Sequence, residues 1–112
     1  MEKQWIFINK KNRFERVWFH DILWASGRGS STAIFVKDPK QGRKQFLYSA
    51  NLKTFSQRVP DSYFLQIHRS HLINPNKVEA IDGKRLVIDG VCIPYADRYK
   101  NIVERRFPKL KT

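Results

Sequence analysis

The sequence predicts a single domain built mostly from β-strands, with two short helices. Its apolar residues gather in short runs separated by polar turns, which is the pattern of strands and not of long helices. Two Asp-Gly pairs, Asp82-Gly83 and Asp89-Gly90, separate such runs near the C-terminus. Both central residues of a type I′ hairpin turn need a positive φ, so these pairs predict hairpins. Only two segments have helical spacing, and we expect eight to ten short strands in all.

Length and composition favour a single folded, basic domain that binds a polyanion over other classes of protein. The chain has 112 residues, which suits one domain, and 41% hydrophobic with 13% aromatic content, which suits a packed core. Its 22 Lys and Arg against 10 Asp and Glu leave a net charge of +12. Such an excess attracts polyanions, nucleic acid first and an anionic membrane second. No apolar run approaches the roughly 20 residues of a membrane-spanning helix, so the membrane interpretation is the weaker one.

The start of the chain and its cysteine content indicate a cytoplasmic protein. The first residues lack a basic region followed by an apolar stretch, so no signal peptide is expected. Cys92 is the single cysteine, which rules out an internal disulfide. Because it lies in an apolar run, we expect it to be a small buried hydrophobic residue.

The N-terminal half predicts five strands. Polar turns separate the runs, and Gly27 to Ser31 form a flexible loop with one long basic side chain. The segment from Lys37 to Lys44 joins the last two strands as a hairpin. The expected strands are Trp5 to Ile8, Phe14 to Phe19, Ile22 to Ala25, Ala33 to Val36 and Gln45 to Tyr48.

The two helices flank the remaining strands. Leu52, Phe55 and Val59 have helical spacing, with Ser49 or Asn51 as N-cap and Pro60 as terminator. Three runs after residue 77 predict a β-meander, and a last helix follows with one apolar stripe. The meander strands are Val78 to Ile81, Arg85 to Ile88 and Val91 to Pro94, and the stripe is Tyr99, Ile102, Val103 and Phe107. We expect six aromatic residues in the core: Trp5, Phe7, Trp18, Trp24, Phe55 and Phe64.

A polar block interrupts the apolar stretch from Phe64 to Asn74. Packing alone would not place His68, Arg69, Ser70 and His71 between Ile67 and Leu72. The block therefore predicts a strand end or loop that presents a guanidinium group and hydroxyls to a partner. Asn74-Pro75-Asn76, which follows, is a strong turn signal.

The residues for catalysis or metal binding are sparse, so we expect no enzyme, no cofactor and no small-molecule substrate. His68 and His71 are separated by an odd number of positions, which places them on opposite faces of a strand unless the strand breaks between them. One Cys and three His make a zinc site improbable. Gly27-Arg28-Gly29 lacks the further residues of either nucleotide-binding glycine loop.

The order of motifs resembles the LytTR family of bacterial DNA-binding domains. The shared features are Phe64, His68-Arg69-Ser70, Leu72-Ile73-Asn74 and Ile93-Pro94 before the last helix. The resemblance spans about Trp5 to Phe107, so we expect one LytTR-type domain over residues 1–112. It implies three small antiparallel β-sheets in an elongated stack. It also implies sequence-specific binding of double-stranded DNA, with bending, by loops inserted into successive major grooves, and transcription regulation like that of response regulators.

The same resemblance assigns DNA contacts by position. The first reading loop falls on Arg28, Ser30, Ser31 and Thr32, and the central contacts fall on His68, Arg69 and Ser70. Arg98 is the last base-reading side chain, and Ser49, Asn51 and Lys53 are the phosphate-facing part. Arginine can bind guanine O6 and N7 in a bidentate way, so we expect Arg28 and Arg98 to read bases. Arg69 either reads a base or grips a phosphate.

The chain departs from the family pattern at several positions. Ala96 stands where the family commonly has Ser, so we expect Asp97 to take over the N-cap. His71 replaces a usual aromatic residue and Gln66 a usual Arg. Most members of the family carry a receiver domain and we expect none here, so regulation would not act through one unless these residues are part of a longer protein.

Simpler roles remain open for the same residues. Arg69 can pair with Asp61 or Glu79, Arg28 and Arg98 can be solvated charges, and His68 can hold its loop in place. The alternative function is a basic β-domain that binds RNA, single strands or an anionic protein without sequence choice. A scarcity of exposed aromatic strands disfavours single-strand binding. The target site, the regulatory sense and signal, and a homodimer on a repeated site are left open.

Overall fold

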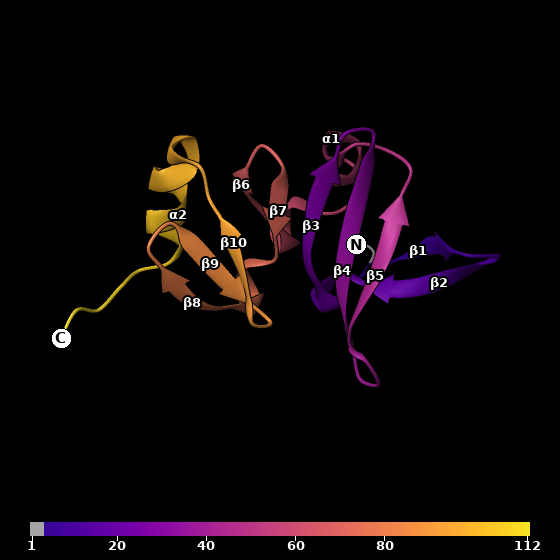
Figure 1. The fold of residues 1–112 in the computed structure, drawn as a ribbon, viewed down its shortest axis with the longest axis horizontal. Helices are drawn as coiled ribbons and strands as arrows, with labels where there is room; N and C mark the ends of the chain where they lie inside the picture. Colours follow the sequence, from indigo (N-terminus) through magenta and orange to yellow (C-terminus); the bar gives the residue numbers. More distant parts are fainter. Residues whose placement is uncertain (1–3) are drawn as a thin grey trace.

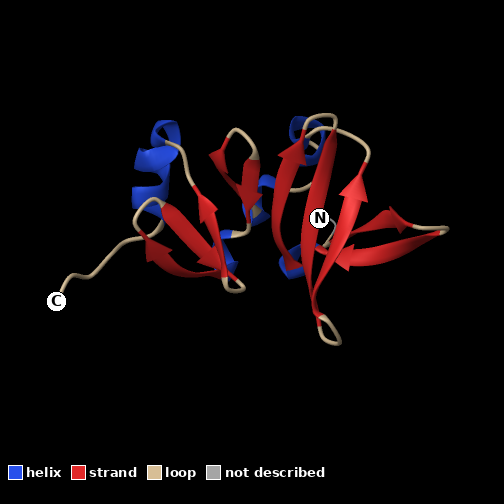
Figure 2. Ribbon diagram, in the orientation of Figure 1, coloured by secondary structure: helices blue, strands red, loops and turns tan. Residues whose placement is uncertain are grey.

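The computed structural model describes residues 4–112, which form ten strands and two α-helices in three antiparallel sheets. Residues 1–3, part of the segment used to judge a signal peptide, lie outside the described residues. The sheets follow one another along an elongated body of 50 × 30 × 29 Å (Figures 1 and 2). The fold class predicted from the sequence is therefore confirmed.

The first sheet is a hairpin of β1 (Trp5–Lys10) and β2 (Arg13–Trp18). Ile8 and Val17 are buried against the central sheet. The opposite face is open: Phe7 is 47% exposed and Trp18 is 39% exposed. The expectation that these two aromatic residues belong to the core was wrong, because only one face of the hairpin meets the rest of the protein.

The central sheet has five strands and its middle strand is the most buried. Apolar side chains of β3 at Ile22, Leu23, Trp24 and Ala25 are all buried, because the strand is covered on both faces. The predicted hairpin between residues 33 and 48 is present as β4 and β5. The strand order is β5 (Gly42–Tyr48), β4 (Ser31–Asp38), β3 (Ile22–Arg28), β7 (His71–Ile73) and β6 (Leu65–His68).

Helix α1 (Leu52–Ser56) packs on the central sheet. Asn51 is its N-cap, since the side-chain oxygen accepts a hydrogen bond from the Thr54 N–H at 2.8 Å. The helix ends before Val59, although Val59 is buried as the helical spacing predicted. A Cβ atom at Gly27 would lie 3.3 Å from the Leu52 Cβ, so the absence of a side chain there allows close approach of α1.

The third sheet is the predicted meander of β8 (Val78–Asp82), β9 (Arg85–Ile88) and β10 (Val91–Pro94). Its second turn has positive φ at both Asp89 and Gly90, as expected. The first turn differs: Asp82 still pairs with Arg85, so Gly83 and Lys84 are its central residues and only Gly83 has a positive φ. Cys92 is exposed and not buried, because its neighbour Ile93 takes the inward position.

The last helix, α2 (Lys100–Arg106), lies over the end of the molecule formed by the third sheet (Figure 1). Val103 is its buried side chain, whereas Ile102 is 39% exposed, so the apolar stripe is narrower than predicted. A single 3₁₀ turn, Asp97–Tyr99, precedes the helix, and its N-cap Ala96 provides no side-chain hydrogen bond. The expectation that Asp97 would cap was wrong, since its carboxylate binds the Lys84 ammonium group.

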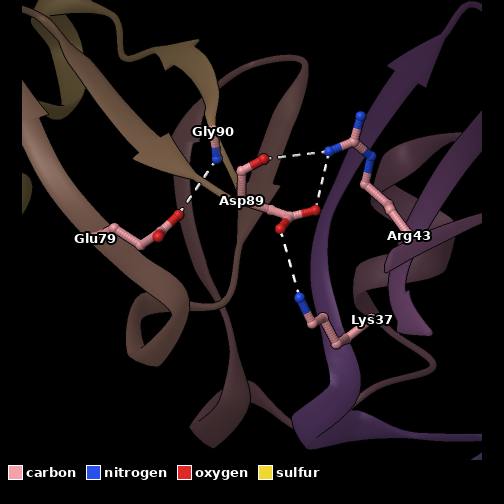
Figure 3. Close-up of polar contacts among 5 residues, drawn as sticks. All are labelled: Lys37, Arg43, Glu79, Asp89 and Gly90. Carbon is pink, nitrogen blue, oxygen red and sulfur yellow. Dashed lines mark hydrogen bonds and ion pairs between the residues drawn. The ribbon is translucent and has the colours of Figure 1, made fainter. Parts of the chain in front are cut away.

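The central and third sheets are joined by an apolar core and by one polar cluster. The turn residue Asp89 carries a carboxylate 3.0 Å from the Arg43 Nη1 and 3.6 Å from the Lys37 Nζ (Figure 3). The adjacent Gly90 N–H donates to the Glu79 Oε1 at 3.3 Å. This Asp89 cluster connects the β9–β10 turn to β4 and β5, and so ties two sheets together.

Candidate nucleic-acid interface

Four connecting segments that are distant in sequence lie along one edge of the molecule, at the top in Figures 1 and 2. They are the β3–β4 turn, the start of α1, the β6–β7 turn and the connection from β10 to α2. We call them the loop edge, and its residues are 28–31, 49–53, 68–71 and 95–98. All of the residues assigned as DNA contacts except Thr32 fall within it.

Hydrogen bonds hold the first and third segments side by side. The Gly27 N–H donates to the Ser70 carbonyl at 2.9 Å, just below the two turns. The Ser26 hydroxyl and the His71 Nδ1 share a second hydrogen bond at 2.9 Å. Ser26 and His71 are cross-strand partners of β3 and β7. The β3–β4 and β6–β7 turns are therefore fixed relative to one another.

Two further bonds fix the outer segments. The Ala96 N–H donates to the Ile67 carbonyl at 2.9 Å, which holds the connection after β10 against β6. The Thr32 hydroxyl donates to the Ala50 carbonyl at 2.8 Å, which holds the start of α1 against β4. The loop edge is thus a continuous hydrogen-bonded row and not four independent loops.

The cationic side chains of this edge are exposed. Arg69 forms no ion pair with Asp61 or Glu79, nor any other salt bridge within residues 4–112. The Arg98 guanidinium carbon lies 5.7 Å from the centre of the Tyr99 ring. The exposed residues among those assigned from the sequence are Arg28, Ser30, Ser49, Asn51, Lys53, Arg69 and Arg98.

Some of the assigned residues build the edge instead of projecting from it. Thr32 is 0% exposed, so its assignment as a DNA contact was wrong. The side-chain oxygen of Asn51 is already used, because it caps α1 by accepting the Thr54 N–H. The half-buried Ser31 donates from its hydroxyl to the Arg28 carbonyl at 3.3 Å, and so braces the turn that carries Arg28.

His68 makes the contact expected of the simpler of its two predicted roles, that of holding its loop in place. Its Nδ1 accepts a hydrogen bond from the Ser70 N–H at 3.0 Å, which shapes the turn around Arg69. The strand breaks between His68 and His71, which was the stated exception to their placement on opposite faces, and their ring centres lie 4.8 Å apart. Burial, and secondly the charge of His68, lower the pKa of His71 below its ordinary value.

The proximity of the two imidazoles does not make a metal site of the usual composition. Within residues 4–112, no cluster of three or more His, Cys, Asp or Glu side chains is arranged to hold an ion. Over the same residues, none of the helices has the length and apolar character needed to cross a membrane.

The acidic Asp97 beside Arg98 is already paired. Its carboxylate accepts a hydrogen bond from Lys84, which lowers the pKa of Asp97 and raises the pKa of Lys84. Lys84 comes from the β8–β9 turn, so sequence proximity did not reveal it. Ser26 and Gly27 were missed for the same reason, because their partners Ser70 and His71 are more than forty positions away.

These features define a small basic β-domain whose exposed cations stand on its connecting loops. The sequence profile of the LytTr DNA-binding domain matches residues 12–107, which is most of the chain. The chain therefore belongs to the family of LytTr DNA-binding domains.

Individual relatives agree with this assignment. Proteins named transcriptional regulatory protein YpdB, from Escherichia coli K12 and Shigella flexneri, are each 26% identical over 81 residues. That alignment covers 72% of this chain and 31% of each relative, so the chain spans about a third of their length. The LytTr DNA-binding domain of a Bacillus cereus protein has the same fold, with a TM-score of 0.74 and 16% identity, covering 94% of this chain and 97% of that one.

Proposed function

We propose that this protein regulates transcription by binding a specific double-stranded DNA site with its loop edge. The single observation that carries the proposal is the alignment of Arg28, Lys53, Arg69 and Arg98, all exposed, along one hydrogen-bonded row. Guanidinium groups can read guanine edges in the major groove and grip phosphates beside it. The unit that we propose is residues 1–112, with a core of about 5–107.

The shape of the molecule supports contact with two successive major grooves. The β3–β4 turn and the connection before α2 lie toward different ends of the loop edge (Figure 1). Arg28 and Arg98 would then enter different grooves on one side of the duplex, with Arg69 between them.

The roles separate into base reading and phosphate binding. Arg28 and Arg98 are proposed to read bases, since they are exposed on opposite end segments and form no carboxylate pair within residues 4–112. Lys53 and the Ser49 hydroxyl face phosphates. Arg69 is the residue for which the geometry permits either role, because its turn is held at the middle of the edge by His68 and Ser70.

The proposal is tested by measuring discrimination between a selected duplex and its scrambled version. Selection from random duplex DNA at physiological salt supplies the site, the spacing of any repeated half-sites and the number of chains bound. Arg98→Ala should then reduce discrimination by roughly 1–3 kcal/mol, because a bidentate base contact is lost. Lys53→Ala should weaken binding to both duplexes equally, as a phosphate contact would.

Two results would contradict this assignment. Unchanged discrimination in Arg98→Ala would remove Arg98 from the base-reading set. Equal competition by duplex DNA, single strands and heparin would show that binding is charge-driven and without sequence choice, as in the alternative function considered from the sequence.

A further inference from the structure

The outward face of the β1–β2 hairpin carries a cluster of aromatic rings around one arginine. In the hairpin register Trp5 pairs with Trp18 and Phe7 pairs with Arg16, so these four side chains share one face. Phe14 lies on the same face nearer the tip and is 66% exposed. We call these five residues the hairpin face. Three of its rings, those of Phe7, Phe14 and Trp18, are exposed together, and Trp5 is half-buried beside them, which is more than scattered surface residues would produce.

The Arg16 guanidinium lies close to three of the rings. Its guanidinium carbon lies 4.6 Å from the Trp5 ring centre, 5.4 Å from that of Phe7 and 5.8 Å from that of Trp18. No carboxylate pairs with Arg16 among the residues that the structure describes. The guanidinium is therefore pre-positioned, and a planar donor in this state suits a bidentate carboxylate.

The surroundings of the hairpin face are also positive. Arg58 is exposed and lines the adjoining groove. The hairpin carboxylate Glu15 lies on the opposite face, where Lys44 and Arg13 pair with it. The hydrogen bond from Lys44 lowers the pKa of Glu15. Charge complementarity thus favours an acidic partner over a basic one.

A groove continues the face toward α1. Its volume is 580 Å³, and Trp5, Phe7, Phe19, Arg58, Val59 and Pro60 line it. An apolar side chain of a partner can enter such a groove while an adjacent carboxylate meets Arg16. Aromatic and arginine residues beside a pocket are the usual composition of strong protein-binding sites.

The hairpin projects sideways from the end of the molecule opposite α2, away from the loop edge (Figure 1). DNA on the loop edge would leave the hairpin face open, so both surfaces could be occupied together. The face therefore has no part in the DNA contacts proposed above.

We propose that the hairpin face docks an acidic segment of a partner protein, with a carboxylate on Arg16 and an apolar side chain in the groove. A second copy of this chain fits poorly, because it would bring one Arg16 against another. Stacked nucleic-acid bases also fit poorly, because the guanidinium of Arg16 already lies over the aromatic rings. Both alternatives are outcomes of the test.

The test is selection of a displayed random short-peptide library on the folded protein, followed by affinity measurement for the enriched peptides. The expected peptides place Asp or Glu beside Phe, Trp or Leu. Arg16→Gln and Trp18→Ala should each weaken their binding by roughly tenfold or more, since a charge-assisted contact or an anchor is lost. The peptide affinity of Arg16→Lys should lie between those of the wild type and Arg16→Gln, because lysine keeps the charge and lacks the planar pair of donors.

The matched control for Trp18→Ala is Ile102→Ala on α2, because Ile102 and Trp18 are both 39% exposed. It should leave peptide affinity unchanged, and all variants should keep wild-type thermal unfolding and duplex binding. If the Arg16→Gln variant does not fold, the peptide affinities of the Arg16→Lys and Trp18→Ala variants test the proposal. Enriched peptides without an acidic excess would overturn the proposal, and so would peptides that bind the hairpin variants as tightly as the wild type. Oligothymidine binding that depends on Trp18 would show a nucleic-acid partner instead, and self-association that Trp18→Ala abolishes would show a second copy of the chain.

Discussion

Polar side chains at the loop edge differ in whether their hydrogen-bonding groups are already used. The side chains of His68 and Asn51, and of Thr32 beside the edge, already bond to nearby backbone groups, whereas Arg28 and Arg69 are exposed. A side chain whose donor or acceptor is already satisfied in the fold is costly to redirect to a ligand. The first group therefore shapes the turns, and the second group is available to a partner.

Thr32 provides a direct test of this distinction. Thr32→Val keeps the shape of the side chain but removes the hydroxyl that donates to the Ala50 carbonyl. We expect the free energy of unfolding to fall by about 1–3 kcal/mol, with discrimination between cognate and scrambled duplex unchanged. Chemical denaturation and competition titrations measure the two quantities, and Thr32→Ser should restore stability. A loss of discrimination without a loss of stability would return Thr32 to the contact set.

His71 predicts a pH response of the same turn. Burial holds its pKa in the folded state below the ordinary value of 6.5, so the unfolded chain takes up the proton more readily. Stability from this residue is therefore present above pH 6.5 and is lost as the pH falls from there toward the lower folded pKa. Denaturation above and below that pH should show a smaller decrease in His71→Asn than in the wild type. His20→Asn, at an exposed histidine, should leave the response in place, and an equal effect of both changes would refute the assignment.

At the scale of single residues, the sequence could not show which apolar side chains face outward. Trp5, Ile6, Phe7 and Ile8 form an uninterrupted apolar run, so the strand lacks the alternation that distinguishes a buried face from an exposed one. The run at Val91-Cys92-Ile93 has the same ambiguity. Thr32 was assigned by position from the family resemblance, whereas in the structure it is a buried residue of β4.

Elements formed by local signals were predictable, whereas their partners were not. The Asp89-Gly90 turn, the meander and the Asn51-capped start of α1 depend on neighbouring residues, and all three are present. The turn at Asp82-Gly83 formed one position further on, with Gly83 and Lys84 at its centre. The pairing of β3 with β7 brings Ser26 to His71 across 45 positions, and it gives the loop edge its rigidity. Such contacts follow from tertiary topology, so the DNA-contact candidates were identified through the family resemblance and their arrangement only through the structure.

The Asp89 cluster is the element that connects the two sheets carrying the ends of the loop edge. The central sheet bears the β3–β4 turn with Arg28, and the third sheet leads into the segment with Arg98. Asp89 pairs with Arg43 and Lys37 on the side of the molecule away from the loop edge (Figures 1 and 3). The cluster is therefore placed to influence the angle between the sheets and the separation of the two arginines.

Asp89→Asn tests this role without disturbing the turn, because Asn also tolerates a positive φ. We expect at most about 1 kcal/mol of lost stability, since the ion pairs are partly exposed. The DNA bend should change, measured by the mobility of circularly permuted fragments, and cognate affinity should fall more than scrambled-duplex affinity. Asp82→Asn is the matched control, because it makes the same charge change in a turn whose ion pair with Arg85 stays within one sheet. Identical bends in both variants and the wild type would show that the core alone sets the angle.

For the whole molecule, the net charge of +12 raises the question of which part of the surface attracts DNA. A diffuse positive surface would bind DNA in many orientations, whereas a row of exposed cations along one edge favours one orientation. The β4–β5 turn, which includes Lys40, lies at the edge opposite the loop edge (Figure 1). Lys40 and Lys53 are both exposed, so position and not charge distinguishes the two.

Salt dependence separates these cases. Each neutralised phosphate contributes about −0.9 to the slope of log affinity against log salt, because condensed counterions are released. Lys53→Gln should make the slope shallower by about 0.9, since it removes a phosphate contact at the loop edge. Lys40→Gln makes the same charge change at the opposite edge, so it should leave the slope unaltered. Fluorescence anisotropy of a labelled duplex over a salt series measures both slopes. If the two substitutions lower the slope equally, DNA does not choose the loop edge and the functional proposal fails.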